Sequence, residues 1–240
     1  MRPLLLATLF LALAPDAGAV NPVVRFTTPI GAFDVELCQE VSAQCAGAAP
    51  NTVAHFLATV DAGAYTNSFV HRSAPNFVIQ GGAITWDGVS FGNVCPAPCP
   101  TIANEYNQSN VRGTVSVPLA LGNPDSGTTG WFVNTANNSF LDAQSFTVFG
   151  RVIGDGMTVV DAINDAFLLY WDFTNWPDGT PVTPDYECNP DGQGTCTTDP
   201  HPYLVLTEIT RVPEPGALAA ACSAVAVLVG LARRRRALPG

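Results

Sequence analysis

The stretch SFVHRSAPNFVIQGG places His71 and Arg72 a few residues ahead of an apolar run that ends in Gln80 and two glycines. An arginine guanidinium stays charged and presents its N–H donors in a rigid fork, so it can act on a ligand from a fixed position. Arg72 is also rare, because the chain has no lysine and only five arginines lie between residues 20 and 211. This stretch is therefore the first candidate for a functional site.

Acidic residues dominate the region around this candidate site. Residues 20–211 contain eighteen Asp and Glu against five Arg, a net charge of −13. Nucleic-acid phosphates need a basic protein surface, so this charge argues against nucleic acid as a partner. It suits an exported domain that is soluble.

The elements around the candidate site are mostly short strands. Residues 23–37 alternate apolar and polar side chains around a Pro-Ile-Gly turn, which predicts a hairpin. Residues 68–70 and 77–80 predict strands on either side of a turn. The Gly-, Pro- and Asn-rich stretch 83–110 predicts a long surface loop.

The second half of the chain continues the strand pattern. Residues 114–117, 131–134, 147–152 and 203–212 predict further strands, separated by turn-rich segments. Helical spacing of apolar residues predicts two helices, one that starts at Pro50 and ends near Gly63, and one over residues 157–166. Many strands with two helices indicate one mainly β domain, either a barrel or a sandwich.

Residues 1–19 have the order of a secretory signal peptide. Arg2 precedes an apolar run over residues 4–14, and Ala-Gly-Ala ends the segment. A buried N-terminal helix is the alternative. We expect an exported chain whose domain covers residues 20–211.

Residues 212–240 combine a Pro-Glu-Pro motif, seventeen residues without charge and four arginines, Arg233 to Arg236. This layout resembles the PEP-CTERM sorting signal of Gram-negative bacteria. The resemblance implies a processing partner of the exosortase type, and a location in the periplasm, outer envelope or extracellular matrix. A permanent C-terminal membrane anchor is the alternative, since the apolar run is at the short limit for a transmembrane helix. In either case the membrane is at least a transient partner.

Seven cysteines are spaced as three local pairs and one single residue, Cys222. In an exported chain such pairs predict disulfides, and local pairing is the simplest of the fifteen connectivities that six cysteines allow. Zinc binding is the alternative, but CxxC pairs are absent and the three histidines are not spaced as ligands beside the cysteines. We therefore expect no metal. The disulfide candidates are Cys38 with Cys45, Cys95 with Cys99, and Cys188 with Cys196.

Three segments together resemble the cyclophilins. FVHRSAPNFVIQGG is similar to the cyclophilin signature, GTTGWFVNTANNSFLDAQSFTVFGRVIGDGMTVVDAI to the second half of bacterial cyclophilins, and PIGAFDVELCQEVSAQCAGAAPNTVAHFL to their opening hairpin and first helix. The resemblance spans residues 23–210 in the order of the family. It implies an eight-stranded antiparallel barrel capped by two helices, with peptidyl-prolyl cis/trans isomerase (rotamase) activity in protein folding and no cofactor.

The resemblance also implies roles for individual residues. Arg72 matches the catalytic arginine of the family, and Gln80 matches a glutamine that hydrogen-bonds the substrate backbone. His71 matches the histidine beside the catalytic arginine, and we expect it to be a supporting residue. Apolar substrate contacts are implied for Phe77, Val78, Phe132 and Leu141, and positions matching two further contacts are Phe140 and Phe146.

The chain departs from the family at two places near the expected site. Gly130 replaces a second substrate-binding glutamine, and Pro118-Leu119 replaces an Ala-Asn or Ala-Arg pair. We expect an isomerase that acts on X-Pro bonds of exported or envelope proteins. The alternative is a weakly active or inactive module that binds proline-containing segments at the cell surface, and a third is a barrel used only as a structural scaffold.

Overall fold

The computed structural model describes residues 20–95, 98–166, 168–169, 179–184 and 204–213. Short strands dominate these ranges, with two α-helices and two 3-10 turns between them. The helices are α1 (Pro50–Asp61) and α2 (Gly156–Asn164), and the 3-10 segments are η1 (Pro124–Ser126) and η2 (Ser139–Gln144). The strands are β1 (Val23–Thr28), β2 (Gly31–Leu37), β3 (Ser68–Phe69), β4 (Arg72–Ala74), β5 (Val78–Gly81), β6 (Ile84–Trp86), β7 (Phe91–Asn93), β8 (Thr114–Ser116), β9 (Trp131–Asn134), β10 (Val148–Ile153), β11 (Leu168–Leu169), β12 (Thr180–Pro181) and β13 (Leu206–Arg211).

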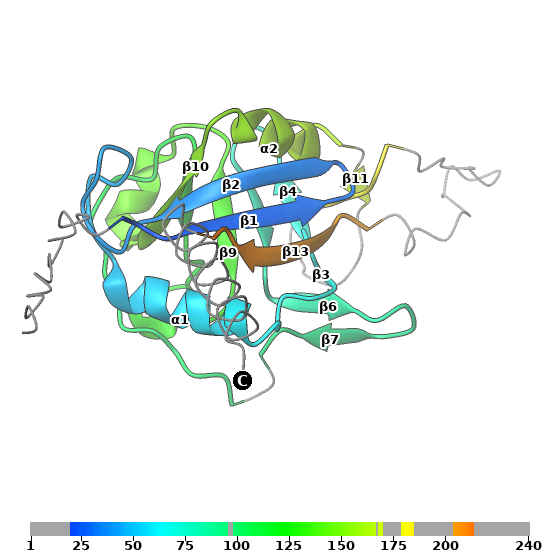
Figure 1. The fold of residues 1–240 in the computed structure, drawn as a ribbon, viewed down its shortest axis with the longest axis horizontal. Helices are drawn as coiled ribbons and strands as arrows, with labels where there is room; N and C mark the ends of the chain where they lie inside the picture. Colours follow the sequence, from blue (N-terminus) through cyan, green and yellow to red (C-terminus); the bar gives the residue numbers. More distant parts are fainter. Residues whose placement is uncertain (1–19, 96–97, 167, 170–178, 185–203, 214–240) are drawn as a thin grey trace, which may run out of the picture.

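Eleven of these strands form one antiparallel sheet that curls back on itself. The order is β4-β5-β9-β8-β10-β2-β1-β13-β3-β6-β7. Strands β3 and β4 are separated only by Val70 and His71, whose N–H groups donate to Val205 and to Gln80. One bent segment therefore pairs with β5 through β4 and with β13 through β3. Counted as one strand, this segment completes a barrel of eight strands, which confirms the expected fold. Helices α1 and α2 lie on opposite sides of the barrel (Figure 1).

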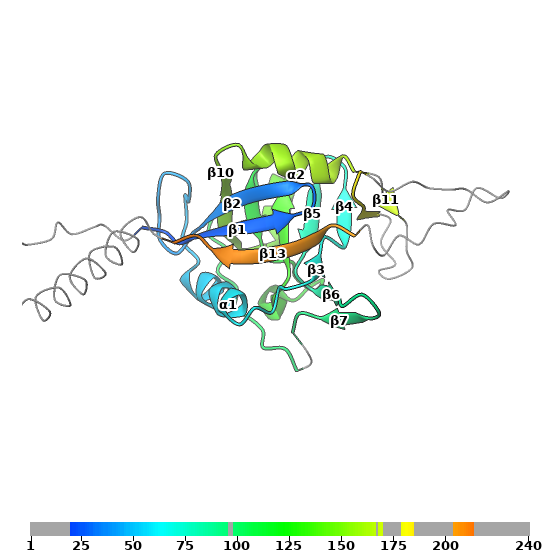
Figure 2. The same cartoon turned by 45° about the vertical axis from the view of Figure 1, so that its right-hand side comes forward.

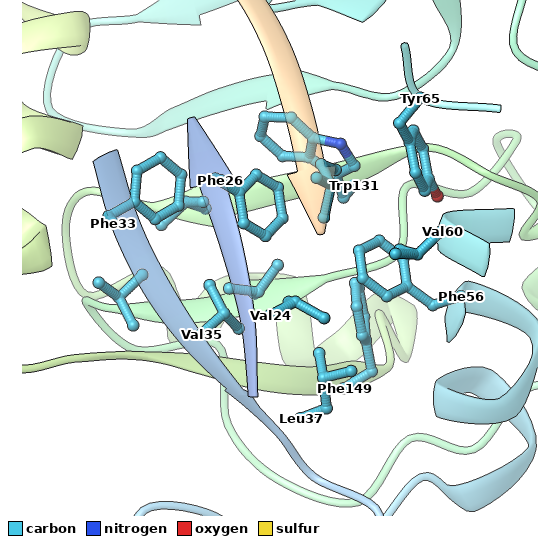
Figure 3. Close-up of a cluster of buried hydrophobic side chains, with 14 of the residues drawn as sticks. Val24, Phe26, Phe33, Val35, Leu37, Phe56, Val60, Tyr65, Trp131 and Phe149 are labelled. Atoms are coloured by element: carbon cyan, nitrogen blue, oxygen red, sulfur yellow. The ribbon is translucent and has the colours of Figure 1, made fainter. Parts of the chain in front are cut away.

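The barrel interior holds a core rich in aromatic side chains. Rings from β1, β9 and α1 gather there, and Phe26 meets Trp131 edge-on with ring centroids 5.1 Å apart (Figure 3). The two glycines that end the opening motif have a packing reason. A Cβ at Gly81 would lie 2.5 Å from the Trp131 ring, and one at Gly82 would lie 2.4 Å from it. Only glycine at these positions lets Trp131 fill the barrel.

The two helices start and end close to where the sequence places them. Pro50 occupies the first turn of α1, where its missing N–H costs nothing. Ala49 offers no side-chain cap. Instead, the carboxylate of Glu105 accepts from the N–H groups of Asn51 at 3.1 Å and Thr52 at 2.7 Å. A distant loop therefore caps this helix.

The stretch predicted as one long loop contains a hairpin. Strands β6 and β7 pair, and Trp86 meets Phe91 across them with ring centroids 4.6 Å apart. Asp87 accepts from the N–H groups of Val89 and Ser90 to form the turn. The loop prediction was wrong over this segment because the aromatic cross-strand pair outweighs the turn-rich composition.

Two of the three predicted cysteine pairs are disulfides, Cys38–Cys45 and Cys95–Cys99. The third predicted pair lies outside the described residues, as does Cys222. Within the described ranges, no three His, Cys, Asp or Glu side chains gather closely enough to hold a metal ion. No helix in these ranges reaches the length and hydropathy of a membrane span, and the segments 1–19 and 214–240 lie outside them.

Candidate active site

Three neighbouring strands carry the central site residues in one row. Arg72 on β4 pairs with Gln80 on β5, and Gln80 pairs with Phe132 on β9; β4 and β5 run side by side (Figure 2). Directly opposed residues of antiparallel strands point to the same face of the sheet. Ile79 and Val133, which alternate with them, are fully buried in the barrel core. Strand alternation thus places the row on the outer face.

A groove with a volume of about 840 Å³ runs over this outer face. Its floor is formed by Val78, Phe132 and Leu141, with Phe77 and Phe146 packed against them. These residues and Ala74, which does not line the groove, make up an apolar cluster separate from the barrel core. The groove brings together seven of the eight residues predicted for catalysis and substrate contact, namely Arg72, Phe77, Val78, Gln80, Phe132, Leu141 and Phe146.

Arg72 stands at the edge of this apolar floor. Its Nη1 donates to Oε1 of Gln80 at 3.2 Å, and its Cζ lies 5.5 Å from the centroid of the Phe77 ring. A guanidinium over an aromatic face is attracted by the negative face of the ring. These contacts fix a cationic donor where it can meet a polar ligand atom while the apolar part of the ligand lies in the groove.

The two further aromatic residues predicted for the site are placed differently. Phe146 lines the groove and meets Phe132 edge-on, with ring centroids 5.7 Å apart. Phe140 is 62% exposed and stacks on Phe77 at 5.7 Å, outside the groove lining. Phe140 therefore contacts the site through the Phe77 ring, and its contact with a substrate stays a prediction.

His71 is buried next to the catalytic candidate. Its ring meets Phe69 edge-on at 6.4 Å, and its carbonyl oxygen accepts from Oγ1 of Thr180 at 2.8 Å. Burial, and to a smaller degree the charge of Arg72, lowers the pKa of His71 to about 4. The imidazole is therefore neutral at pH 7, which suits the supporting role predicted for it and leaves the positive charge to Arg72.

A buried polar network that the sequence did not point to holds Phe77 in place. The Phe77 carbonyl accepts from the N–H of Thr135 at 2.9 Å and from Nδ2 of Asn138 at 2.8 Å. The same Asn138 amide donates to Asn134, which donates to Oγ1 of Thr114 at 2.9 Å. Satisfied buried networks of this kind hold side chains in one geometry. The asparagine-rich stretch NTANN is the sequence signal that could have revealed it.

Asp142 anchors η2, the segment that brings Leu141 to the groove. Its carboxylate accepts from Oγ of Ser109 at 2.5 Å and from the N–H of Asn110 at 2.9 Å. Burial by itself raises the pKa of Asp142, but these hydrogen bonds outweigh burial and hold the pKa below its usual value. An ionised carboxylate therefore ties one groove wall to the barrel.

Asn104 joins the two loops that flank the groove. Its Nδ2 donates to the carbonyl of Pro124 at 3.2 Å and to the carbonyl of Ser145 at 2.7 Å. Its Oδ1 accepts from the N–H of Tyr106 at 2.9 Å. Both Pro124 and Ser145 line the groove, so one side chain sets the spacing between its two walls. No local pattern in the sequence singles out Asn104.

Comparison with known proteins agrees with this geometry. A family model described as "Cyclophilin type peptidyl-prolyl cis-trans isomerase/CLD" matches residues 23–180. A crystal structure of a cyclophilin-type peptidyl-prolyl cis-trans isomerase from Cryptosporidium parvum superposes with a TM-score of 0.53 at 18% identity, covering 81% of this chain and 99% of that one. The structural likeness shows that the two chains share a fold.

Curated relatives from bacteria are similar over most of their own length. A peptidyl-prolyl cis-trans isomerase of Acinetobacter baylyi is 34% identical over 149 residues, which cover 60% of this chain and 72% of the relative. Peptidyl-prolyl cis-trans isomerase A of Dickeya dadantii is 32% identical over 154 residues, which cover 62% of this chain and 74% of the relative. Because the family model spans well over half of the chain, including the strands that bear Arg72, Gln80 and Phe132, the chain belongs to the cyclophilin-type peptidyl-prolyl cis-trans isomerases.

Proposed function

We propose that this isomerase acts on X-Pro bonds of exported proteins, with Arg72 as the catalytic residue. The observation that carries the proposal is the row Arg72, Gln80 and Phe132, which sets a cationic donor beside an apolar floor. Phe77, Val78, Phe132 and Leu141 receive the proline ring, with Phe146 at the wall. Gln80 orients the guanidinium and hydrogen-bonds the substrate backbone.

The chemistry needs neither a nucleophile nor a metal. Rotation about a peptide bond has a barrier of about 18–20 kcal/mol because twisting the C–N bond removes amide resonance. In the twisted state the prolyl nitrogen regains a lone pair. A donor already held beside that nitrogen stabilises the twisted peptide more than either planar isomer, and such differential binding lowers the barrier.

Exchange NMR on an Ala-Pro peptide tests the role of Arg72. We expect Arg72→Ala to lower kcat/KM about 100-fold, the usual effect of removing one preorganised donor. Arg72→Lys should recover only part of this loss, since lysine keeps the charge but lacks the fork. Arg25→Ala is the matched control, because Arg25 forms an exposed ion pair with Asp34 on β1 and β2. Equal rates for the wild type and Arg72→Ala would overturn the assignment.

The ends of the chain support export to the envelope or extracellular matrix of a Gram-negative bacterium. Residues 1–19 serve as the signal peptide, and residues 212–240 serve as a PEP-CTERM-type sorting segment for an exosortase-type enzyme. The disulfides Cys38–Cys45 and Cys95–Cys99 support the same proposal, because disulfides persist in oxidising compartments.

Mass spectrometry of the protein isolated from its native cells tests the export proposal. We expect a mature chain that begins near residue 20 and lacks Arg233 to Arg236. An intact arginine tail on the mature protein would favour the permanent anchor instead. An intact N-terminal segment would contradict export through a cleaved signal peptide.

A further inference from the structure

The groove continues from the apolar floor, which we propose receives the proline ring of the substrate, onto the loop after β8. This extension is lined by Pro118, Leu119, Ala120 and Leu121, and Ala143 lines it from η2. None of these side chains carries a charge or a hydrogen-bonding group, and the polar side chains of Asn123, Gln144 and Ser145 line the groove further along the same two loops. Leu121 is 97% exposed, so a large apolar side chain stands in water at the edge of the groove.

The contact between Gly130 and Pro118 helps to make the extension apolar. A Cβ at Gly130 would lie 2.8 Å from Cγ of Pro118 and 3.4 Å from its Cδ. The proline ring therefore occupies the space that any side chain at position 130 would need. Pro118 and Gly130, the two positions at which the chain differs from the cyclophilin pattern, are twelve residues apart in the sequence but adjacent in the fold. Pro118 provides an apolar surface in place of a side chain at position 130.

We propose that this extension is a subsite, formed by Pro118, Leu119 and Leu121, that selects peptides with an apolar side chain close to the isomerised proline. The inference rests on the proposed function, because the proline must occupy the adjoining floor of the same groove. An apolar side chain gains by leaving water against these residues. A polar one loses its water without receiving a hydrogen bond from Pro118, Leu119 or Leu121.

Peptide pairs that contain either leucine or asparagine test the subsite. The two side chains are similar in shape and both uncharged, so they differ in polarity without engaging the net charge of the domain. The variable residue is placed in turn at the two positions before proline and at the one after it. For the wild-type protein we expect kcat/KM to favour leucine about 10-fold at one of these positions, the scale of discrimination by an apolar pocket.

Leu121→Asn probes the origin of the preference. Because Leu121 is exposed, the substitution does not disturb the core, and we expect it to reduce the leucine preference to less than about 3-fold. Val89→Asn is the matched control, since Val89 is 85% exposed at the tip of the β6–β7 hairpin and does not line the groove. It should keep the wild-type preference.

The outcomes separate the subsite from the proposed function. Equal kcat/KM for leucine and asparagine at all three positions, or a preference that Leu121→Asn leaves unchanged, would overturn the subsite alone. Absence of catalysed exchange with every peptide would contradict the proposed function. In that event the Kd of the same peptides, measured by amide chemical-shift titration, still decides the subsite, because selectivity for leucine in binding does not require turnover.

Discussion

The arginine residues in this acidic domain differ in their surroundings. Arg25, Arg112 and Arg211 form ion pairs at the surface with Asp34, Asp161 and Asp61. Exposed pairs of this kind contribute little to stability. Arg72 bonds the amide of Gln80 and lies over Phe77, at the edge of the groove. Arg72 lines the groove and Arg25 does not, so the Arg25 variant is the appropriate control for Arg72.

His71 should make stability depend on pH. Its pKa is lowered to about 4 in the folded protein, from 6.5 for an exposed histidine. Below pH 6.5 the unfolded chain binds a proton that the folded chain does not, so stability is complete above pH 6.5 and is lost as the pH falls toward 4. Urea unfolding should show a loss of about 2 kcal/mol between about pH 7 and pH 5.

His71→Gln should flatten this pH dependence, whatever its effect on stability at pH 7. His55→Gln is the control, since burial also lowers the pKa of His55 but the residue is only half-buried. If the free energy of unfolding of the His71 variant falls with pH as steeply as that of the wild type, groups other than His71 cause the pH dependence.

At the scale of the elements, α1 depends on a cap from outside its own segment. Glu105 accepts four hydrogen bonds from Asn51 and Thr52, two from backbone N–H groups and two from side chains. Glu105→Ala should lower the free energy of unfolding by about 1–2 kcal/mol, the cost of a lost helix cap. Urea unfolding measures this, with Glu208→Ala on the exposed face of β13 as the control. Equal unfolding midpoints for the two variants would show that the cap adds nothing.

The walls of the groove are also an element-level feature, because Asn104 links the loop after β8 to the end of η2. We expect Asn104→Ala to lower kcat/KM for an Ala-Pro peptide about 10-fold, since small losses of positioning are costly in catalysis. The effect should fall mainly on KM, because the walls bind the substrate while Arg72 stays in place. Asn93→Ala on β7 is the control, and a similar loss in both variants would count against a positioning role.

At the scale of the whole molecule, one closed sheet serves two purposes. Inward-pointing side chains around Trp131 build the core, and the outer face of β4, β5 and β9 carries the groove. Because these faces alternate along the same strands, a shift of one residue in register would exchange them. The core therefore holds the functional face in register.

The net charge of −13 for residues 20–211 should affect the choice of substrate. Peptides with lysines outside the residues that contact the groove should have a higher kcat/KM than the same peptides with glutamates, because the field of the domain attracts cations. Measurements at about 20 mM and about 500 mM salt test this, and the difference should shrink at high salt, where charges are screened over a few ångströms. A difference that does not depend on salt would point to direct contacts instead.

The sequence by itself determined the features whose signals are local. Runs of apolar residues predicted most strands of the barrel but not the β6–β7 hairpin, helical spacing predicted α1 and α2, and close spacing predicted two disulfides that the structure contains. The motif that includes Arg72 and Gln80 was readable for the same reason, since one hairpin carries both residues.

Only the tertiary structure decided what joins distant segments. It set Phe132 beside Gln80, placed the Pro118 ring in the space at Gly130, and capped α1 with Glu105. It also left Phe140 exposed on Phe77 and outside the groove lining, which its position next to Leu141 does not reveal. These relations depend on strand register and on closure of the barrel. Both bring together residues that are far apart in the chain, and the local sequence around one such residue does not predict its contact with the other.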